Sequence, residues 1–374
     1  MKKKFLAALG AMTILGAGGY GYYAYYEPTA KEVPLNVDTK QLPYKDLQAE
    51  WKQMNMDRYV TRTAQQVWDT WGDLDKIWTG ANYKDYNLLV VSGEEAWVIS
   101  TDKNIKKISS NDLPMRFSPS GADYSYEAPT KKYNNKPTIK VEVAPGLFKD
   151  EYDQGEFKAL PSSSQLFIFS THEEFHHYQD NWKVDKVDQE KIMALVNNKE
   201  ARKVRLELLA NVRKAVIDTD NEKEHLEAAK YWFDKYQKDH AEDYKTVRGM
   251  DVLEGTARYF DMAVNVRSNI GMNANKEDIY KKYQYLIEKD YPLNISRMNG
   301  LADSESYDLG GAAGVLLEKN RKDKSWQKEA ENGTPLVELL LKDIKATPQQ
   351  PSKEIDNLMK EIVEKQKKLQ EENK

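Results

Sequence analysis

The residues best suited to chemistry lie in one segment, FSTHEEFHHYQD, which spans residues 169–180 and holds three of the five histidines. Residues four apart share one face of an α-helix, so His172 and His176 would direct two imidazoles toward the same point. Zinc accepts neutral imidazole nitrogens, and Glu173 is placed to take a proton from water at such a metal. The pattern predicts a zinc site with its own base. The alternative is a polar helix face with solvated histidines, and Glu174 is expected at the surface.

A catalytic zinc site needs a third protein ligand, with water in the remaining position. The metzincin pattern does not supply it, because Gln179 and Trp182 stand where that class has glycine and histidine. His177 would point about 100° away from the histidine before it on a helix. His225 and His240 lie among lysines and glutamates, which is typical of a solvated face. None of these three histidines is therefore predicted as a ligand.

A glutamate on a second helix is the remaining option for the third ligand. The segment EGTARYFD begins at Glu254, and its small residues Gly255 and Ala257 would let the helix approach another backbone closely. Taken alone, the segment also fits an ordinary helix with an exposed glutamate. A ligand histidine usually donates its other N–H to a carboxylate or carbonyl. Asp261, on the same helix face as Glu254, and Asp251 are the candidates for that supporting role.

Together, His-Glu-x-x-His and Glu-Gly-x-Ala-x-Tyr resemble the gluzincin metallopeptidases over about residues 165–315. The resemblance implies that the Zn²⁺ ligands are His172, His176 and Glu254. It also implies that Glu173 is the general base. Glu254 follows the second histidine by 78 positions, which is longer than the interval in thermolysin-like members, so the resemblance is to a divergent member.

The same resemblance implies a residue that stabilises the oxyanion, since similar enzymes use a tyrosine or histidine to donate a hydrogen bond to the tetrahedral intermediate. Tyr307, in the segment SYDLGGAAGVLLEKN (306–320), is the candidate for this role. The alternative is a tyrosine that flanks a helix in which Gly310 and Gly311 permit close packing. Tyr259 is a second candidate, for which a buried core position is the favoured interpretation.

The hydrophobic period predicts the elements that must position these residues. Apolar residues at near-helical spacing predict a helix over about 46–78. The β-branched runs NLLVVSG (87–93) and AWVIST (96–101) flank a turn and predict a hairpin. A second β region is expected at Tyr124–Ala128 and Thr138–Ala144.

From about residue 162 onward the chain is expected to be almost wholly helical. The predicted helices cover residues 186–197, 199–217, 221–245, 249–267, 276–288 and 308–320. The predicted fold class is therefore α+β, with a small sheet N-terminal to a mostly helical body that carries both motifs. The resemblance implies that this arrangement is zincin-like and that an edge strand holds an extended peptide substrate.

The chain is expected to divide into five parts. They are a signal or membrane anchor (1–26), a linker (27–45), an N-terminal α/β subdomain with edge strands (46–160), a helical zincin body (161–350) and a charged amphipathic C-terminal helix (351–374). The apolar stripe of the last helix predicts packing as its role; it consists of Ile355, Leu358, Met359, Ile362 and Val363.

The first residues indicate export. Three lysines, residues 2–4, precede an uncharged run of 22 residues from 5 to 26. A basic start followed by an apolar segment is the pattern of exported proteins, and this run is just long enough to cross a bilayer with the lysines inside. We favour an uncleaved anchor that leaves the body outside the cytoplasm. Cleavage near the small residues 17–19 would instead release a secreted protein.

Composition narrows the function further. The formal net charge of −4, from 56 basic and 60 acidic residues, gives no electrostatic reason to expect a nucleic-acid partner. The absence of cysteine excludes disulfides, thiolate zinc ligands and cysteine nucleophiles.

The sequence thus predicts an exported, membrane-anchored zinc metallopeptidase that acts on a peptide or protein. Two alternatives stay open: a cell-surface binding or envelope-assembly protein that retains a zincin fold, and a zinc hydrolase of a cell-wall or lipid bond. The sequence does not indicate an oligomeric state.

Overall fold

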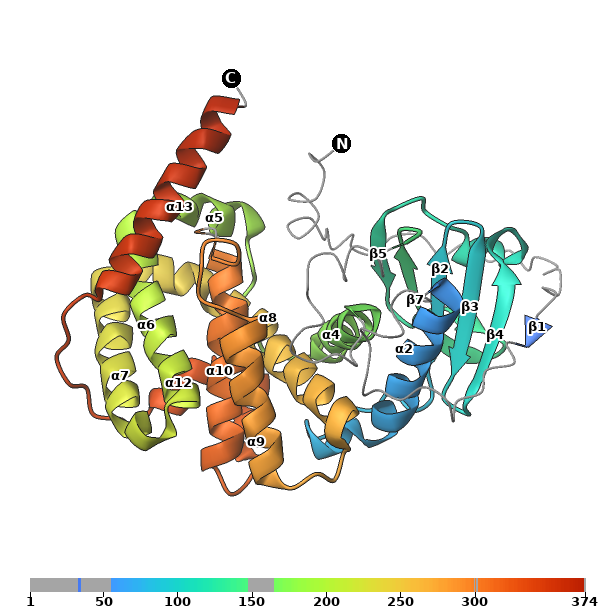
Figure 1. Cartoon of the computed structure of the whole chain (residues 1–374), viewed down its shortest axis with the longest axis horizontal. Helices are drawn as coiled ribbons and strands as arrows, with labels where there is room; N and C mark the ends of the chain where they lie inside the picture. Colours follow the sequence, from blue (N-terminus) through green and yellow to red (C-terminus); the bar gives the residue numbers. More distant parts are fainter. Residues whose placement is uncertain (1–32, 35–54, 147–164, 299, 301, 373–374) are drawn as a thin grey trace.

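The sheet is built by the first part of the chain and the helical body by the rest (Figure 1). The computed structural model describes residues 33–34, 55–146, 165–298, 300 and 302–372. Within these residues the predicted α+β class is confirmed, because the strands all precede residue 144 and helices follow from residue 165. The predicted anchor and nearly all of the predicted linker lie outside the described residues.

Within the described residues, the strands form a mixed sheet in the order β1-β4-β3-β2-β7-β5, with β6 beside β7. Their bounds are β1 Val33–Pro34, β2 Asn87–Ser92, β3 Glu95–Ser100, β4 Asn104–Ser109, β5 Tyr124–Glu127, β6 Lys132–Tyr133 and β7 Lys136–Val143. β2 runs antiparallel to β3 and parallel to β7. The predicted hairpin is thus confirmed as β2 and β3, and the second β region as β5 and β7.

The central strand β2 is buried on both faces. Leu88 and Val90 join the main hydrophobic core, whereas Leu89 and Val91 join a smaller core on the opposite face of the sheet. A strand covered on both sides reads as an uninterrupted apolar run, which explains why NLLVVS shows no alternation. The main core continues from the sheet into the helical body, so the two parts pack as one hydrophobic interior.

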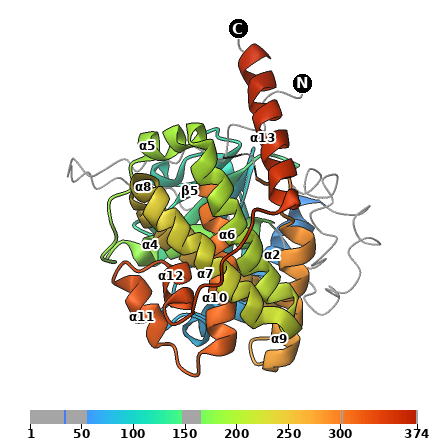
Figure 2. The ribbon, with the colours of Figure 1, turned by 90° about the vertical axis from the view of Figure 1, so that its left-hand side faces the viewer.

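The helices follow the predicted order with some changed boundaries (Figure 2). The α-helices are α2 Met56–Thr70, α4 Gln165–Gln179, α5 Gln189–Ala194, α6 Lys199–Ile217, α7 Glu222–Asp239, α8 Ala241–Ile270, α9 Lys276–Tyr285, α10 Ala302–Asn320, α11 Ser325–Glu331, α12 Leu336–Leu341 and α13 Lys353–Glu372. Short helical turns add η1 Trp71–Lys76, η4 Leu195–Asn197 and the π-helical η6 Leu286–Asp290. Helix α4 contacts both β7 and α8, so it joins the sheet to the helical body.

Predicted helix boundaries are wrong in two places. α10 begins at Ala302, six residues before the predicted start at 308, so Tyr307 lies within a helix and does not flank one. The sequence predicts a helix over 221–245, but α7 ends at Asp239 and α8 begins at Ala241, with His240 in a non-helical conformation between them. The buried guanidinium of Arg202, on α6, binds the carboxylate of Asp243. This tertiary ion pair draws the first turn of α8 toward α6, and no local pattern in the sequence records it.

Helices α8 and α10 approach each other closely where glycines meet. A Cβ placed on Gly255 would lie 3.0 Å from the Cα of Gly310, and a Cβ on Gly310 would collide with the backbone of Gly255. The prediction that small residues beside Glu254 permit a close helix contact is confirmed at this pair. The contact places the stretch of α10 from Ser306 to Gly310 next to the middle of α8.

The C-terminal helix α13 uses its apolar stripe for packing, as predicted. Ile355, Leu358 and Ile362 are buried in the main core. α13 packs against α6, where Lys203 lies 2.6 Å from Asp356. Its charged residues therefore lie around the rim of this contact.

Candidate metal centre

Helix α4 carries both predicted histidine ligands on the side that meets α8. Nε2 of His172 and Nε2 of His176 lie 3.2 Å apart. An oxygen of Glu254, near the middle of α8, lies 3.3 Å from the first nitrogen and 3.2 Å from the second. The structure thus brings the three predicted ligand atoms together in an almost equilateral triangle.

Hydrogen bonds at the other ring nitrogens determine where the imidazole lone pairs point. His172 Nδ1 lies 2.8 Å from the buried carboxylate of Asp261, and His176 Nδ1 lies 2.7 Å from Oε1 of Gln179. The Gln179 amide nitrogen donates to Thr256 Oγ1 at 2.6 Å, so its oxygen is the acceptor that faces the imidazole. In the neutral rings each Nδ1 therefore holds the proton and each Nε2 presents a lone pair to the cluster.

This donor set fits a zinc ion. Two lone pairs and a carboxylate oxygen converge on one point, an arrangement that is repulsive unless positive charge lies between them. Ligands about 2.0–2.1 Å from a tetrahedral zinc lie roughly 3.3–3.4 Å from one another. The separations in this cluster are 3.2 to 3.3 Å. The residues present therefore suit three corners of a zinc tetrahedron.

Protons compete with a cation for the same cluster. Burial lowers the pKa of His172, but the carboxylates of Asp261 and Glu254 outweigh it and raise that pKa to about 9. Burial alone would raise the pKa of Glu254, but His176 and His172 hold it well below its usual range. At a pH below these raised pKa values the imidazoles carry a proton, and a metal can bind only after they release it.

Glu173 lies next to the cluster and is half-buried. Burial raises its pKa, His172 and His176 oppose that rise, and Glu254 adds to it. The carboxyl group of Glu173 therefore lies in the electric field of all three ligand side chains without being one of the clustered groups. A carboxylate in this position is suited to taking up and releasing a proton near the metal.

Tyr307, on α10, stacks against the first ligand. Its ring lies 5.6 Å from that of His172, with 24° between the ring planes. Burial and the hydrogen-bonded carboxylate of Glu254 raise the pKa of Tyr307 well above its ordinary value, so the hydroxyl keeps its proton. The guanidinium of Arg258 lies over the Tyr307 ring, 5.2 Å from its centroid. Tyr307 is thus a neutral hydrogen-bond donor held beside the ligands.

The expectation that Glu174 lies at the surface is wrong. Its side chain is 1% exposed, and the hydroxyl of Tyr126 donates a 2.7 Å hydrogen bond to it. Tyr126 belongs to β5, which packs against α4 beside Glu174 and excludes water there. On the same strand, the ring centroid of Tyr124 lies 4.2 Å from that of Phe169 on α4. Burial raises the pKa of Glu174 to about 8, although the Tyr126 hydrogen bond lowers it.

The structure separates the remaining candidates from the cluster. His177 pairs with a neighbouring aspartate on the exposed side of α4, as its angular position predicts. Asp251 binds the buried guanidinium of Arg205, so Asp261 alone of the two candidate aspartates supports a ligand histidine. Tyr259 is buried in the core, which is the interpretation that the sequence favours.

Two supporting residues were not identified from the sequence. Gln179 lies one helical turn after His176 and fixes its ring, and this spacing is the signal that points to it. Arg258 lies 3.1 Å from Asp261, one turn before it on α8. Gln179 thus holds a histidine of the cluster directly, whereas Arg258 holds Asp261, which in turn holds His172.

No family model, curated protein or solved structure matches this chain. None of the helices in the described part of the chain is long and apolar enough to cross a membrane.

Proposed function

We propose that the protein is a zinc-dependent metallopeptidase of gluzincin type with a zincin-like body. The observation that carries the proposal is the triangle of His172 Nε2, His176 Nε2 and a Glu254 oxygen at 3.2 to 3.3 Å, with both Nδ1 atoms already engaged. Such a donor set is far more specific than the five-residue motif, because it needs two helices in register and two supporting hydrogen bonds.

Each residue of the site has a role in peptide hydrolysis. Bound zinc would supply a Lewis acid for the scissile carbonyl and lower the pKa of a water molecule. Glu173 accepts the proton of the attacking water and returns it to the leaving nitrogen. Tyr307 donates its hydroxyl hydrogen to the oxyanion that develops on the substrate carbonyl. Asp261 and Gln179 keep the imidazoles in the tautomer that such a site requires.

The sheet offers a place for an extended peptide. β5 pairs only with β7 among the described strands, so its other edge has backbone groups available for an added strand. β5 lies beside α4, as the ring contact between Tyr124 and Phe169 shows. A peptide that extended the sheet at β5 would run next to the helix that carries both histidine ligands.

The intact base favours a hydrolase over a binding protein. Glu173 is not one of the clustered ligands, so a protein that only bound zinc would not need it. A peptide bond is proposed as the substrate because a strand-like substrate suits the β5 edge. The basic and apolar N-terminal residues support an exported, membrane-anchored location for this activity.

The test is metal content and peptidase activity of matched variants. The wild-type protein should bind one zinc ion per chain, and Glu254→Ala should lose it. Glu173→Gln should keep the zinc but lose turnover of an unstructured protein such as casein. Glu242→Ala, an exposed acid in the first turn of the same helix, is the control and should change neither property. Unchanged zinc content in Glu254→Ala would remove it from the ligand set, and full activity of Glu173→Gln would exclude its role as the base.

A further inference from the structure

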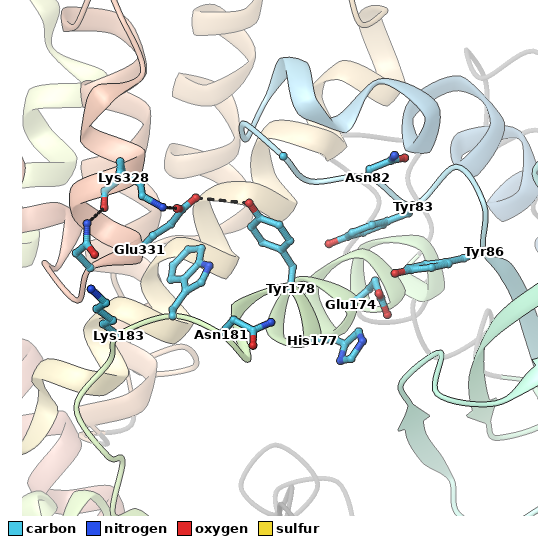
Figure 3. Close-up of a pocket in the computed structure, with 13 residues that line it drawn as sticks. Asn82, Tyr83, Tyr86, Glu174, His177, Tyr178, Asn181, Lys183, Lys328 and Glu331 are labelled. Atoms are coloured by element: carbon cyan, nitrogen blue, oxygen red, sulfur yellow. Dashed lines mark hydrogen bonds and ion pairs between the residues drawn. The ribbon is translucent and has the colours of Figure 1, made fainter.

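A cavity of about 580 Å³ opens beside the C-terminal half of α4 (Figure 3). Three parts of the chain line it: the loop between η1 and β2, the end of α4 with the turn that follows, and α11. The loop contributes Tyr83 and Tyr86, and α4 contributes Glu174 and Tyr178. None of the residues assigned to the metal centre lines this cavity, so it is a separate site.

One buried polar group at this cavity lacks a hydrogen-bond partner, and a buried acid beside it lacks a cation. Tyr83 is 2% exposed, yet its hydroxyl has no hydrogen-bond partner in the described structure. Glu174 accepts one hydrogen bond, from Tyr126, and no lysine, arginine or histidine of the described residues forms an ion pair with it. Buried polar groups in native proteins are almost always partnered, so an unpartnered hydroxyl next to an acid without a cation indicates a missing ligand.

Of the other charged residues that line the cavity, Glu331, Lys328 and His177 have partners, whereas Lys183 forms no ion pair within the described residues. Glu331, on α11, accepts hydrogen bonds from Lys328 at 2.8 Å and from the Trp78 indole at 3.1 Å. His177 lies 2.8 Å from Asp180. The carboxyl group of Glu174 is therefore the acid at this cavity that still lacks a cation.

The aromatic lining is also suited to a cation. The rings of Tyr83 and Tyr86 stack with centroids 6.1 Å apart and 15° between their planes, and Figure 3 shows Glu174 beside them. The rings of Tyr178 and Trp182 form a further edge-to-face pair, 6.1 Å apart. Aromatic faces attract ammonium groups through the ring quadrupole, and they also cover an alkyl stem.

We propose that this cavity binds a primary alkylammonium group. Its N–H groups would donate to the carboxylate of Glu174 and to the hydroxyl oxygen of Tyr83, and its methylene groups would lie among the tyrosine rings. A quaternary ammonium has no N–H to donate, so it would leave the Tyr83 hydroxyl unpartnered and would add no hydrogen bond to the one that Glu174 accepts from Tyr126. A free amine and a lysine side chain share this chemistry.

Calorimetric titration of the zinc-loaded protein with n-butylammonium chloride tests the proposal, with n-butanol as the neutral ligand of the same shape. Butylammonium should bind at millimolar concentration and butanol at least about tenfold more weakly, because only the cation compensates the acid. Absence of butylammonium binding at about 10 mM, or equal binding of butanol, would overturn the proposal.

Variants locate the site. Glu174→Gln should weaken butylammonium binding by about tenfold or more, and Tyr83→Phe by a few-fold. Glu331→Gln is the matched control, because it removes an acid of the same cavity that already has a cation partner, and it should change binding by less than about threefold. Zinc content and melting temperature verify that each variant is folded. Wild-type affinity in Glu174→Gln, or an equal loss in Glu331→Gln, would contradict the assignment.

A last titration distinguishes the two sources of the ammonium group. Nα-acetyl-lysine N-methylamide carries the same group with peptide bonds attached. Tighter binding of this compound than of butylammonium would identify a lysine side chain as the occupant, and binding of butylammonium alone would identify a free amine.

Discussion

The carboxylate of Asp261 lies 2.8 Å from Nδ1 of His172, so a residue of α8 holds the ring of a ligand on α4. Asp261 also lies on the same helix as Glu254, the proposed third ligand, two turns further along. One helix thus supplies both a ligand and the support for another ligand. The geometry of the cluster therefore depends on how α4 and α8 pack.

Asp261→Asn should weaken zinc binding by roughly 10- to 100-fold without removing it, because the neutral amide no longer increases the basicity of His172. Competition with a chromogenic chelator measures the change in affinity. Asp218→Asn is the control: Asp218 lies 3.0 Å from His225 in another, partly exposed carboxylate–histidine pair that is not part of the cluster. Equal zinc affinity in wild type and Asp261→Asn would show that the hydrogen bond does not support the ligand.

Zinc should stabilise the fold more as the pH rises from about 6.5 to about 9. The pKa of His172 is raised from 6.5 to about 9 in the folded protein without metal. Burial lowers this pKa, but the carboxylates of Asp261 and Glu254 raise it by more. A raised pKa contributes stability below the unfolded value, and this contribution is lost as the pH passes through the folded value. Zinc displaces the same proton, so its binding is favoured in that interval.

Melting temperatures of the zinc-free and zinc-loaded proteins across this interval measure the effect. The difference between the two should widen with pH. A difference that stays constant or narrows would show that His172 does not exchange a proton for the metal.

His172 and His176 could be predicted from the sequence because they obey local spacing, whereas Glu254, on another helix, followed from the resemblance of the two motifs to a known family. His172 and His176 share a helix face whatever surrounds them, and Asp261 shares one with Glu254. Glu174 could not be placed in the same way, because its burial depends on Tyr126 of β5, 48 positions away. Contacts of that kind arise from tertiary packing, which no periodicity records.

The strands show the same difference between features that a local pattern predicts and features that depend on tertiary packing. The hairpin of β2 and β3 could be predicted because apolar runs flank a glycine turn. β4 could not, because its two apolar residues, Ile105 and Ile108, are three apart and join opposite cores of the sheet. A strand with one apolar residue on each face has no alternating pattern to detect.

Gly310→Ala should destabilise the fold by about 1–3 kcal/mol, because the added methyl group meets the backbone of Gly255 and forces α8 and α10 apart. The same displacement would move Tyr307 away from Glu254 and lower activity. Denaturant unfolding measures the free energy of unfolding. Gly72→Ala is the control, since its Cβ meets nothing within 4 Å, and it should be neutral. Wild-type stability of Gly310→Ala would show that the close helix contact is absent in solution.

Tyr307→Phe should lower kcat by about 100-fold and leave zinc content unchanged. The phenylalanine ring can still stack on His172, so the ligand geometry is kept, whereas the donor for the oxyanion is lost. KM should change little, because the hydrogen bond forms only as charge develops on the substrate oxygen.

Tyr259→Phe is the matched control for this change. Its hydroxyl lies 3.1 Å from Glu318 in the core, so its removal should lower the melting temperature and leave kcat unchanged. If kcat fell in Tyr259→Phe but not in Tyr307→Phe, the oxyanion role would have to be reassigned. If KM alone rose in Tyr307→Phe, the hydroxyl would bind substrate in the ground state and would not stabilise the transition state specifically.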